Sequence, residues 1–148
     1  MITPEQLVKS GTEHGHQAAI FCWANQNLDR YPQLKWLFAV PNGFYGSATQ
    51  KGKMKVEGLK NGVPDIWLPV KSSIIITNIE NRNTTYEYKS SSTKNYSGLI
   101  IELKVGKNKT SKEQDDWIEF LRSNEYKVEV CYGWEEAVKV IIEYLGQQ

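Results

Sequence analysis

The sequence lacks most features of secreted and membrane proteins. Its 148 residues contain only two cysteines, Cys22 and Cys131, which are too few to suggest a disulfide framework. No apolar run approaches the roughly 18 residues that a membrane-spanning helix needs. Residues 1–5 lack the basic start and apolar core of a secretory signal. We therefore expect one soluble domain over residues 1–148, located in the reducing cytoplasm and away from membranes.

The sequence also lacks a net charge that would by itself indicate a partner, since the total is only +1. The charges are nevertheless unevenly distributed. Residues 1–112 contain 15 Lys and Arg but 8 Asp and Glu, whereas residues 113–148 contain 3 and 9. Basic clusters at residues 51–60 and 104–112 could bind phosphate groups. They could also be solvated surface loops, and the acidic C-terminal part could belong to a protein–protein adaptor.

Alternating and helical patterns predict an α/β fold. Strands are expected at 98–105 and 126–132, and the helix between them gives the spacing of a βαβ crossover. One central mixed sheet flanked by helices is the architecture that suits this order. The other expected elements, in chain order, are a helix from residue 13 that ends before 31, a buried strand within 34–40, a loop over 47–62 with at most a helical turn at 54–59, a strand at 65–68, a hairpin pairing 73–79 with 84–88, a mobile loop at 89–95 and a final helix from 134.

Polar residues stand at helix positions that should face inward. Glu13 and Gln17 begin a stripe that is otherwise apolar on the helix from residue 13. Ser111 and Gln114 form a capping-box pattern, and Gln114 begins the inward stripe of the helix that follows. Because both stripes begin at helix ends, these polar side chains could reach a cleft.

Charged residues also occupy the expected strands. Glu102 and Lys104 share one face of the strand at 98–105, and Asp65 begins the strand at 65–68. If the two strands are neighbours, Asp65 and Glu102 could share a hard cation such as Mg²⁺, and Lys104 could stabilise a transition state. Each pattern also has a plainer interpretation. Glu102 and Lys104 could form an exposed ion pair, and Asp65 could sit in an ordinary turn.

Together these motifs resemble the VRR-NUC domain, the virus-type replication–repair nuclease of the PD-(D/E)XK superfamily. The resemblance extends over nearly everything from residue 13 to residue 145. Its motifs are Glu13 and Gln17, Pro41-Asn42-Gly43, Glu57-Gly58, Gly62-Val63-Pro64-Asp65, Ile101-Glu102-Leu103-Lys104, Ser111-x-x-Gln114 and Gly133-Trp134-Glu135-Glu136-Ala137.

The resemblance implies a restriction-endonuclease-like α/β fold. It also implies an enzyme that hydrolyses DNA phosphodiesters to 5′-phosphate and 3′-hydroxyl ends and needs no nucleotide cofactor. Small stand-alone members resemble Holliday junction resolvases of phages and prophages, which act in recombination and repair as homodimers on branched double-stranded DNA. A symmetric dimer suits this substrate because a four-way junction needs two cuts. A flap- or nick-directed endonuclease, a less selective one, or a DNA-binding module that does not cut remain alternatives.

The resemblance also assigns roles to residues. Lys104 would be the catalytic lysine, Glu13 would support the metal through water, and Gln114 would orient Lys104 or a phosphate. The implied ligands of Mg²⁺ or Mn²⁺ are Asp65, Glu102 and the Leu103 carbonyl. Candidate DNA-binding residues are Asn42, Lys51, Lys53, Lys55, Lys107, Lys109 and Ser111.

The chain departs from a compact member of this family in one segment. Residues 71–97 separate the two motif strands and look like an inserted hairpin or flap. This insertion could contact DNA or a dimer partner, or it could be a tolerated surface loop. We expect His14 and His16 to be incidental surface residues, because positions i and i+2 of a helix do not share a face.

Overall fold

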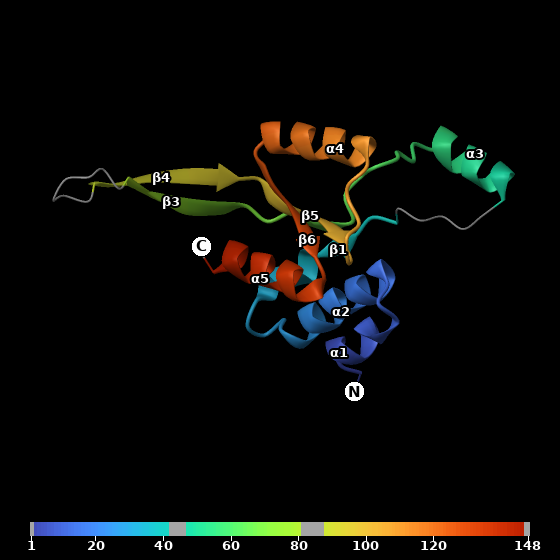
Figure 1. Ribbon diagram of the computed structural model, residues 1–148, viewed down its shortest axis with the longest axis horizontal. Coiled ribbons are helices and arrows are strands. Elements are labelled where there is room, and N and C mark those ends of the chain that lie inside the picture. Colours follow the sequence, from blue (N-terminus) through green and yellow to red (C-terminus); the bar gives the residue numbers. More distant parts are fainter. Residues whose placement is uncertain (1, 42–46, 81–87, 147–148) are drawn as a thin grey trace.

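The protein is described by a computed structural model that covers residues 2–41, 47–80 and 88–146, without the side chains at 48, 51, 76–80 and 88–91 (Figure 1). No helix in this described part is long and apolar enough to cross a membrane. The elements are α1 (Pro4–Leu7), a 3₁₀ turn (Val8–Ser10), α2 (Glu13–Gln26), a second 3₁₀ turn (Pro32–Trp36), β1 (Phe38–Ala39), α3 (Ala48–Val56), β2 (Ile66–Leu68), β3 (Ser72–Glu80), β4 (Tyr88–Tyr96), β5 (Gly98–Lys104), α4 (Lys112–Ser123), β6 (Tyr126–Tyr132) and α5 (Trp134–Leu145).

The central sheet has four strands in the order β1-β2-β5-β6. Strand β2 is antiparallel to β1 and to β5, whereas β5 and β6 are parallel and joined by α4. The register pairs Ile66 with Ile101, so Asp65 lies one step before β2 at the level of Glu102. The predicted mixed sheet, its βαβ crossover and its flanking helices are confirmed.

The two faces of β5 pack against different helices. Leu99, Ile101 and Leu103 pack with α2 and α5 in the larger core, and Ile100 packs with α4 in the smaller one. Figure 1 shows α4 on one side of the sheet and α2 with α5 on the other. The side chains of β5 therefore alternate between the two cores as the sequence predicts, since successive side chains of a strand point to opposite faces.

The segment between β1 and β2 differs from its prediction. The expected buried strand within 34–40 is confirmed only in part. Residues 32–36 form a 3₁₀ turn, and the strand is reduced to β1, which spans two residues and is exposed at Phe38. The expected loop over 47–62 is wrong, because it contains α3, nine residues long. Ser47 accepts a hydrogen bond from the Gln50 N–H and Gln50 bonds back, so a capping box begins a helix that periodicity does not reveal.

The segment 71–97, which we expected to be an inserted hairpin or flap, contains a long two-stranded ribbon, β3–β4. Its register pairs Ser72 with Tyr96 and Glu80 with Tyr88. The predicted pairing of 73–79 with 84–88 is therefore wrong in its second strand, and residues 89–95 are strand and not a loop. Residues 81–87, which include Arg82, lie outside the described part, as does the Lys89 side chain.

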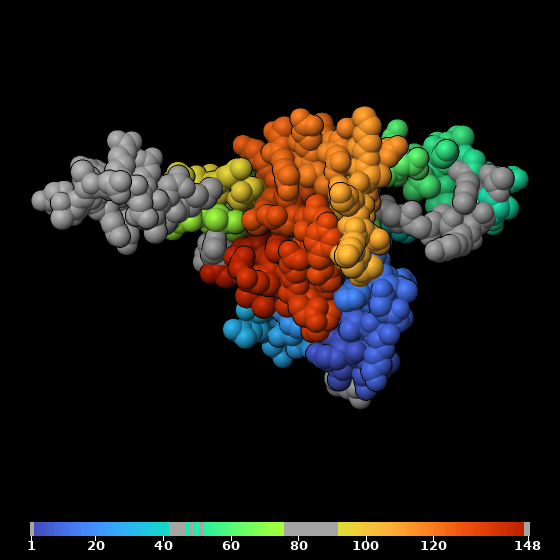
Figure 2. All heavy atoms as spheres, viewed as in Figure 1, coloured from blue at the N-terminus to red at the C-terminus, as the bar shows by residue number. Residues whose placement is uncertain are grey.

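The base of the ribbon is fixed to α5. Ser72 Oγ donates to the Tyr144 carbonyl at 3.0 Å, and the Tyr144 hydroxyl donates to the Val70 carbonyl at 2.6 Å. Beyond this base the ribbon extends away from the body, and α3 stands apart on the opposite side (Figures 1 and 2). The molecule thus has a packed centre and two projecting elements.

Candidate active site

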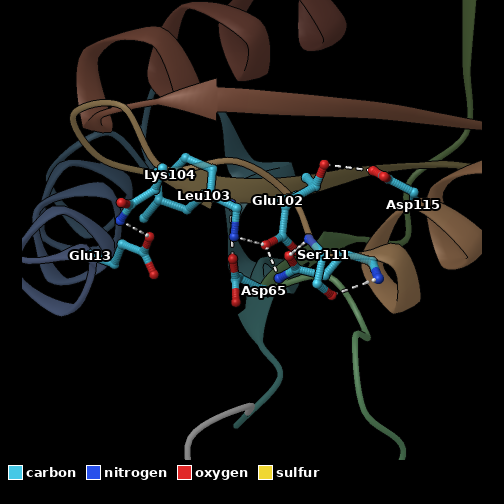
Figure 3. Close-up of polar contacts among 10 residues, drawn as sticks. Glu13, Asp65, Glu102, Leu103, Lys104, Ser111 and Asp115 are labelled. Carbon is cyan, nitrogen blue, oxygen red and sulfur yellow. Dashed lines mark hydrogen bonds and ion pairs between the residues drawn. The ribbon is translucent and has the colours of Figure 1, made fainter.

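A cleft of about 610 Å³ opens where the end of β5 meets the starts of β2, α2 and α4. The helix starts lie there because Thr12 and Ser111 cap them. Figure 3 shows the side chains that converge on this cleft, with Glu13 and Ser111 on opposite sides of the β5 residues. The residues predicted to act in catalysis or to bind the metal all line it, namely Glu13, Asp65, Glu102, Leu103, Lys104 and Gln114.

Asp65 links the two motif strands. Its Oδ2 atom accepts a hydrogen bond from the Leu103 backbone N–H at 2.8 Å. Pro64, which is buried, precedes it and fixes the entry of the chain into β2. The amide and carbonyl of one strand residue point to the same edge of that strand, so the Leu103 carbonyl also faces the Asp65 side. Two acceptor oxygens from different strands therefore lie beside one another.

Glu102 and Lys104 form a buried ion pair, so the alternative of an exposed pair is wrong. Lys104 Nζ donates to Glu102 Oε1 at 2.6 Å, and both side chains are almost entirely buried. Burial raises the pKa of Glu102 to about 7, against the pull of Lys104, and repulsion from Asp65 and Glu13 adds to the rise. Burial alone would lower the Lys104 pKa, but Glu102 raises it above its usual value.

Gln114 also bonds Glu102. The Ser111 amide donates to Gln114 Oε1 at 2.9 Å, which turns the Gln114 amide nitrogen toward Glu102 Oε1, to which it donates. Lys104 and Gln114 therefore share one carboxylate oxygen. The other oxygen, Glu102 Oε2, is buried and has no hydrogen-bond partner among the described residues. A buried anionic oxygen without a donor is costly, so the site favours a positive group at Oε2.

Glu13 faces the cleft from the first turn of α2. Its Oε1 atom accepts a hydrogen bond from Asn108 Nδ2 at 3.3 Å. Asn108 belongs to the loop between β5 and α4. Glu13 is close enough to raise the pKa values of both Glu102 and Lys104. The hydrogen bond between Asn108 and Glu13 therefore joins α2 to the loop that leads into α4.

The donor set fits a small divalent cation. No group of three His, Cys, Asp or Glu side chains with metal-binding geometry occurs in the described part of the chain. Mg²⁺ needs only one or two carboxylates, because it keeps several waters and binds substrate phosphates. Asp65 and the unpartnered Glu102 Oε2 supply two hard oxygen donors, and the Leu103 carbonyl is a third.

The predicted DNA-binding residues occupy varied positions. Lys53 and Lys55 are exposed on α3, and Lys107 and Lys109 are exposed on the loop before α4. Ser111 is exposed and caps α4, with its Oγ accepting from the Gln114 N–H. Asn42 and the Lys51 side chain lie outside the described residues.

Sequence reasoning missed three residues of this region. His14 lines the cleft but is exposed, as expected. His16 is half-buried and accepts a hydrogen bond from the Trp134 N–H at 3.1 Å, so the expectation of an incidental surface residue is wrong for His16. Asn108 bonds Glu13 across 95 positions of sequence. The place of His14 beside Glu13 was a signal for the first, but the other two contacts depend on packing between distant elements.

Comparisons with known proteins agree with this arrangement. Residues 12–135 match the model of the VRR-NUC domain family. A solved structure described as a VRR_NUC domain protein is 22% identical, has a TM-score of 0.64, and covers 92% of this chain and 89% of its own. At that identity the likeness shows the fold alone. No curated protein matches the chain.

Proposed function

The chain belongs to the VRR-NUC domain family and is a nuclease of the PD-(D/E)XK type, and from this premise we propose that it is a metal-dependent endonuclease of branched DNA. The observation that supports this most is the convergence of Asp65, Glu102 and Lys104 in one cleft. We further propose that it cuts four-way junctions as a homodimer, leaving 5′-phosphate and 3′-hydroxyl ends.

Asp65, Glu102 and the Leu103 carbonyl would hold Mg²⁺ or Mn²⁺. When bound, the cation would activate a water for attack on phosphorus and neutralise charge on the phosphoryl oxygens. Hydrogen bonds within the chain already orient these ligands in the absence of the cation. The Leu103 N–H fixes Asp65, while Lys104 and Gln114 fix Glu102 through Oε1. Oε2 has no hydrogen-bond partner among the described residues and would be available to the cation.

Lys104 would act as a donor and not as a base. Its pKa is raised, so the amine is an ammonium group at neutral pH and has no lone pair to accept a proton. It already donates one hydrogen bond to Glu102. Its other two N–H groups can donate to a phosphate oxygen or to the attacking water, which stabilises negative charge in the transition state.

The homodimer rests on the geometry of the substrate. A resolved four-way junction carries two cuts, whereas Asp65, Glu102 and Lys104 of one chain line a common cleft that would make one cut at a time. Two copies related by a two-fold axis would supply two clefts in matching orientation. The exposed lysines Lys53, Lys55, Lys107 and Lys109 would contact the DNA backbone through charge, without selecting a sequence.

The test compares cleavage of a labelled four-way junction with cleavage of a linear duplex of the same arms. Each is incubated with Mg²⁺, Mn²⁺ or EDTA, and the mass of the protein is measured in solution. Lys104→Ala removes the proposed catalytic lysine. Lys139→Ala is the matched control, because Lys139 is an exposed lysine of α5 that pairs with Glu143 at 4.0 Å and does not line the cleft.

Paired, symmetric nicks in the junction alone would support the proposal if they require metal, disappear in Lys104→Ala and persist in Lys139→Ala. Equal cutting of the linear duplex would leave the endonuclease in place but refute junction selectivity. A folded protein that binds the junction without cutting it in either metal would refute the endonuclease and indicate a DNA-binding module.

A further inference from the structure

The cleft contains one contact that the catalytic motifs do not account for. Asn108 lies in the loop between β5 and α4, and its side-chain amide donates to Glu13 Oε1 at 3.3 Å. Among the described residues, the Glu13 carboxylate accepts no other hydrogen bond. An unanchored glutamate samples several rotamers, whereas a hydrogen-bonded one loses that freedom.

The loop is shaped so that Asn108 reaches α2. The Asn108 N–H donates to the Val105 carbonyl at 3.3 Å, which closes a tight turn over Gly106 and Lys107. Gly106 has φ of +60°, a left-handed conformation that glycine adopts at little cost. The turn bends the chain back immediately after Lys104, and Asn108 is the residue at its end.

Glu13 contributes to the field of the cleft. It lines the same cleft as Asp65, Glu102 and Lys104, so its negative charge acts on all three. A carboxylate there attracts a cation, but only while its side chain points into the cleft. The bond from Asn108 selects that orientation of the Glu13 side chain.

We propose that Asn108 is a positioning residue that holds Glu13 toward the cation-binding site and so strengthens divalent metal binding. The proposal rests on the proposed metal-dependent function. Asn108 itself would contact neither metal nor DNA. It would act only through Glu13, and this separates its role from that of the flanking Lys107 and Lys109.

The experiment measures Mn²⁺ affinity of the protein by isothermal titration calorimetry, without DNA, as a double-mutant cycle. We expect Asn108→Ala to weaken Mn²⁺ binding by about fivefold, because an exposed hydrogen bond to a charged group makes a modest contribution. In a Glu13→Ala background, Asn108→Ala should have no further effect, since its partner is already absent. Asn108→Gln, which keeps an amide donor, should recover part of the affinity.

Three controls separate positioning from general damage. Asn25→Ala removes an exposed asparagine near the other end of α2 and should leave Mn²⁺ affinity unchanged. The melting temperature of Asn108→Ala should stay near that of the wild type. Lys107→Ala with Lys109→Ala should lower DNA affinity but not Mn²⁺ affinity.

Wild-type Mn²⁺ affinity in Asn108→Ala would overturn the inference, as would an equal loss in both the wild-type and Glu13→Ala backgrounds. If the wild-type protein cuts DNA with metal but Asn108→Ala leaves Mn²⁺ affinity unchanged, the positioning role of Asn108 is refuted and the proposed function is retained. A wild-type protein that neither binds Mn²⁺ nor cuts DNA would overturn both.

Discussion

Glu102 is the residue at which burial and charge conflict most strongly. Its side chain is fully buried, its pKa is raised to about 7, and its Oε2 atom has no donor among the described residues. Two donors, Lys104 and Gln114, stabilise only the other oxygen. A divalent cation at Oε2 would satisfy that oxygen and favour the ionised carboxylate.

This conflict predicts that metal affinity depends on pH near neutrality. Burial raises the Glu102 pKa, so below about pH 7 a proton occupies the carboxylate and competes with the cation. We expect the dissociation constant for Mn²⁺ to rise by up to about tenfold for each unit below pH 7, and to level off above pH 8. Calorimetric titrations at pH 6, 7 and 8 measure it, and the same affinity at all three would contradict the assignment of Glu102 as a ligand.

Gly62 matters because α4 lies against it. Its φ is +75°, and a Cβ atom at this position would lie 2.6 Å from the backbone carbon of Glu113, in the first turn of α4. We expect Gly62→Ala to destabilise the protein by about 2–4 kcal/mol, from left-handed strain plus this overlap. Cleavage should also fall, because the displaced turn holds Gln114.

Thermal unfolding and cleavage rates measure these effects. Gly58→Ala is the matched control, since Gly58 has φ of +102° but nothing within 4 Å of the added Cβ. It should show the backbone strain without the steric overlap. Equal losses of stability in the two variants would mean that the contact with α4 has no energetic role.

At the scale of elements, helix starts determine where functional side chains lie. Thr12 and Ser111 cap α2 and α4 and set Glu13 and Gln114 at the edge of the cleft. Helix α5 begins differently, after Gly133, without a side-chain cap of its own. Its first N–H group, that of Trp134, donates instead to His16 of α2. A residue of one helix thus caps another.

We therefore predict that His16→Ala destabilises the protein by about 1 kcal/mol, the usual cost of losing a helix cap. The cause is that the Trp134 N–H at the half-buried start of α5 loses its acceptor. Chemical denaturation measures the free energy of unfolding. His14→Ala is the matched control, because His14 is exposed and its side chain makes no hydrogen bond among the described residues, so this variant should unfold like the wild type. A wild-type value for His16→Ala would refute the capping role.

At the scale of the whole molecule, the β3–β4 ribbon contacts the packed centre mainly at its base. The ribbon is fixed at its base by Ser72 and Tyr144, and beyond that base it extends away from the body (Figure 1). The two cores contain residues from the central sheet, α2, α4 and α5, and Ile74 and Tyr96 from the ribbon base. We therefore expect the part of the ribbon beyond its base to add little to the stability of the centre.

This separation predicts that the ribbon can be shortened. Replacing residues 76–92 by Asn-Gly would join the paired residues Ile75 and Thr93 through a two-residue turn. We expect the free energy of unfolding to change by less than about 1 kcal/mol, and Mn²⁺ affinity to stay unchanged, because base and cleft remain intact. Denaturation and calorimetry measure both, and a protein that fails to fold would show that the outer ribbon supports the centre.

Local patterns determined much of this protein. The alternation of β5, the capping box at Ser111 and the amphipathic α5 each depend on residues close in sequence, so their prediction is confirmed. The order of Asp65, Glu102 and Lys104 likewise indicated the family that the comparisons show. These signals suffice because helix and strand periods, caps and short motifs are properties of a few neighbouring residues.

Only the tertiary structure decided the rest. The serine-rich β4 is a strand because it pairs with the isoleucine-rich β3, and strand preference depends on such neighbours more than on the residues themselves. The unpartnered Glu102 oxygen, the bond between Asn108 and Glu13, and the cap from His16 to α5 join positions that are far apart in sequence. Such contacts arise when packed elements bring side chains together, and no local pattern encodes which atoms will meet or which will be left buried without a partner.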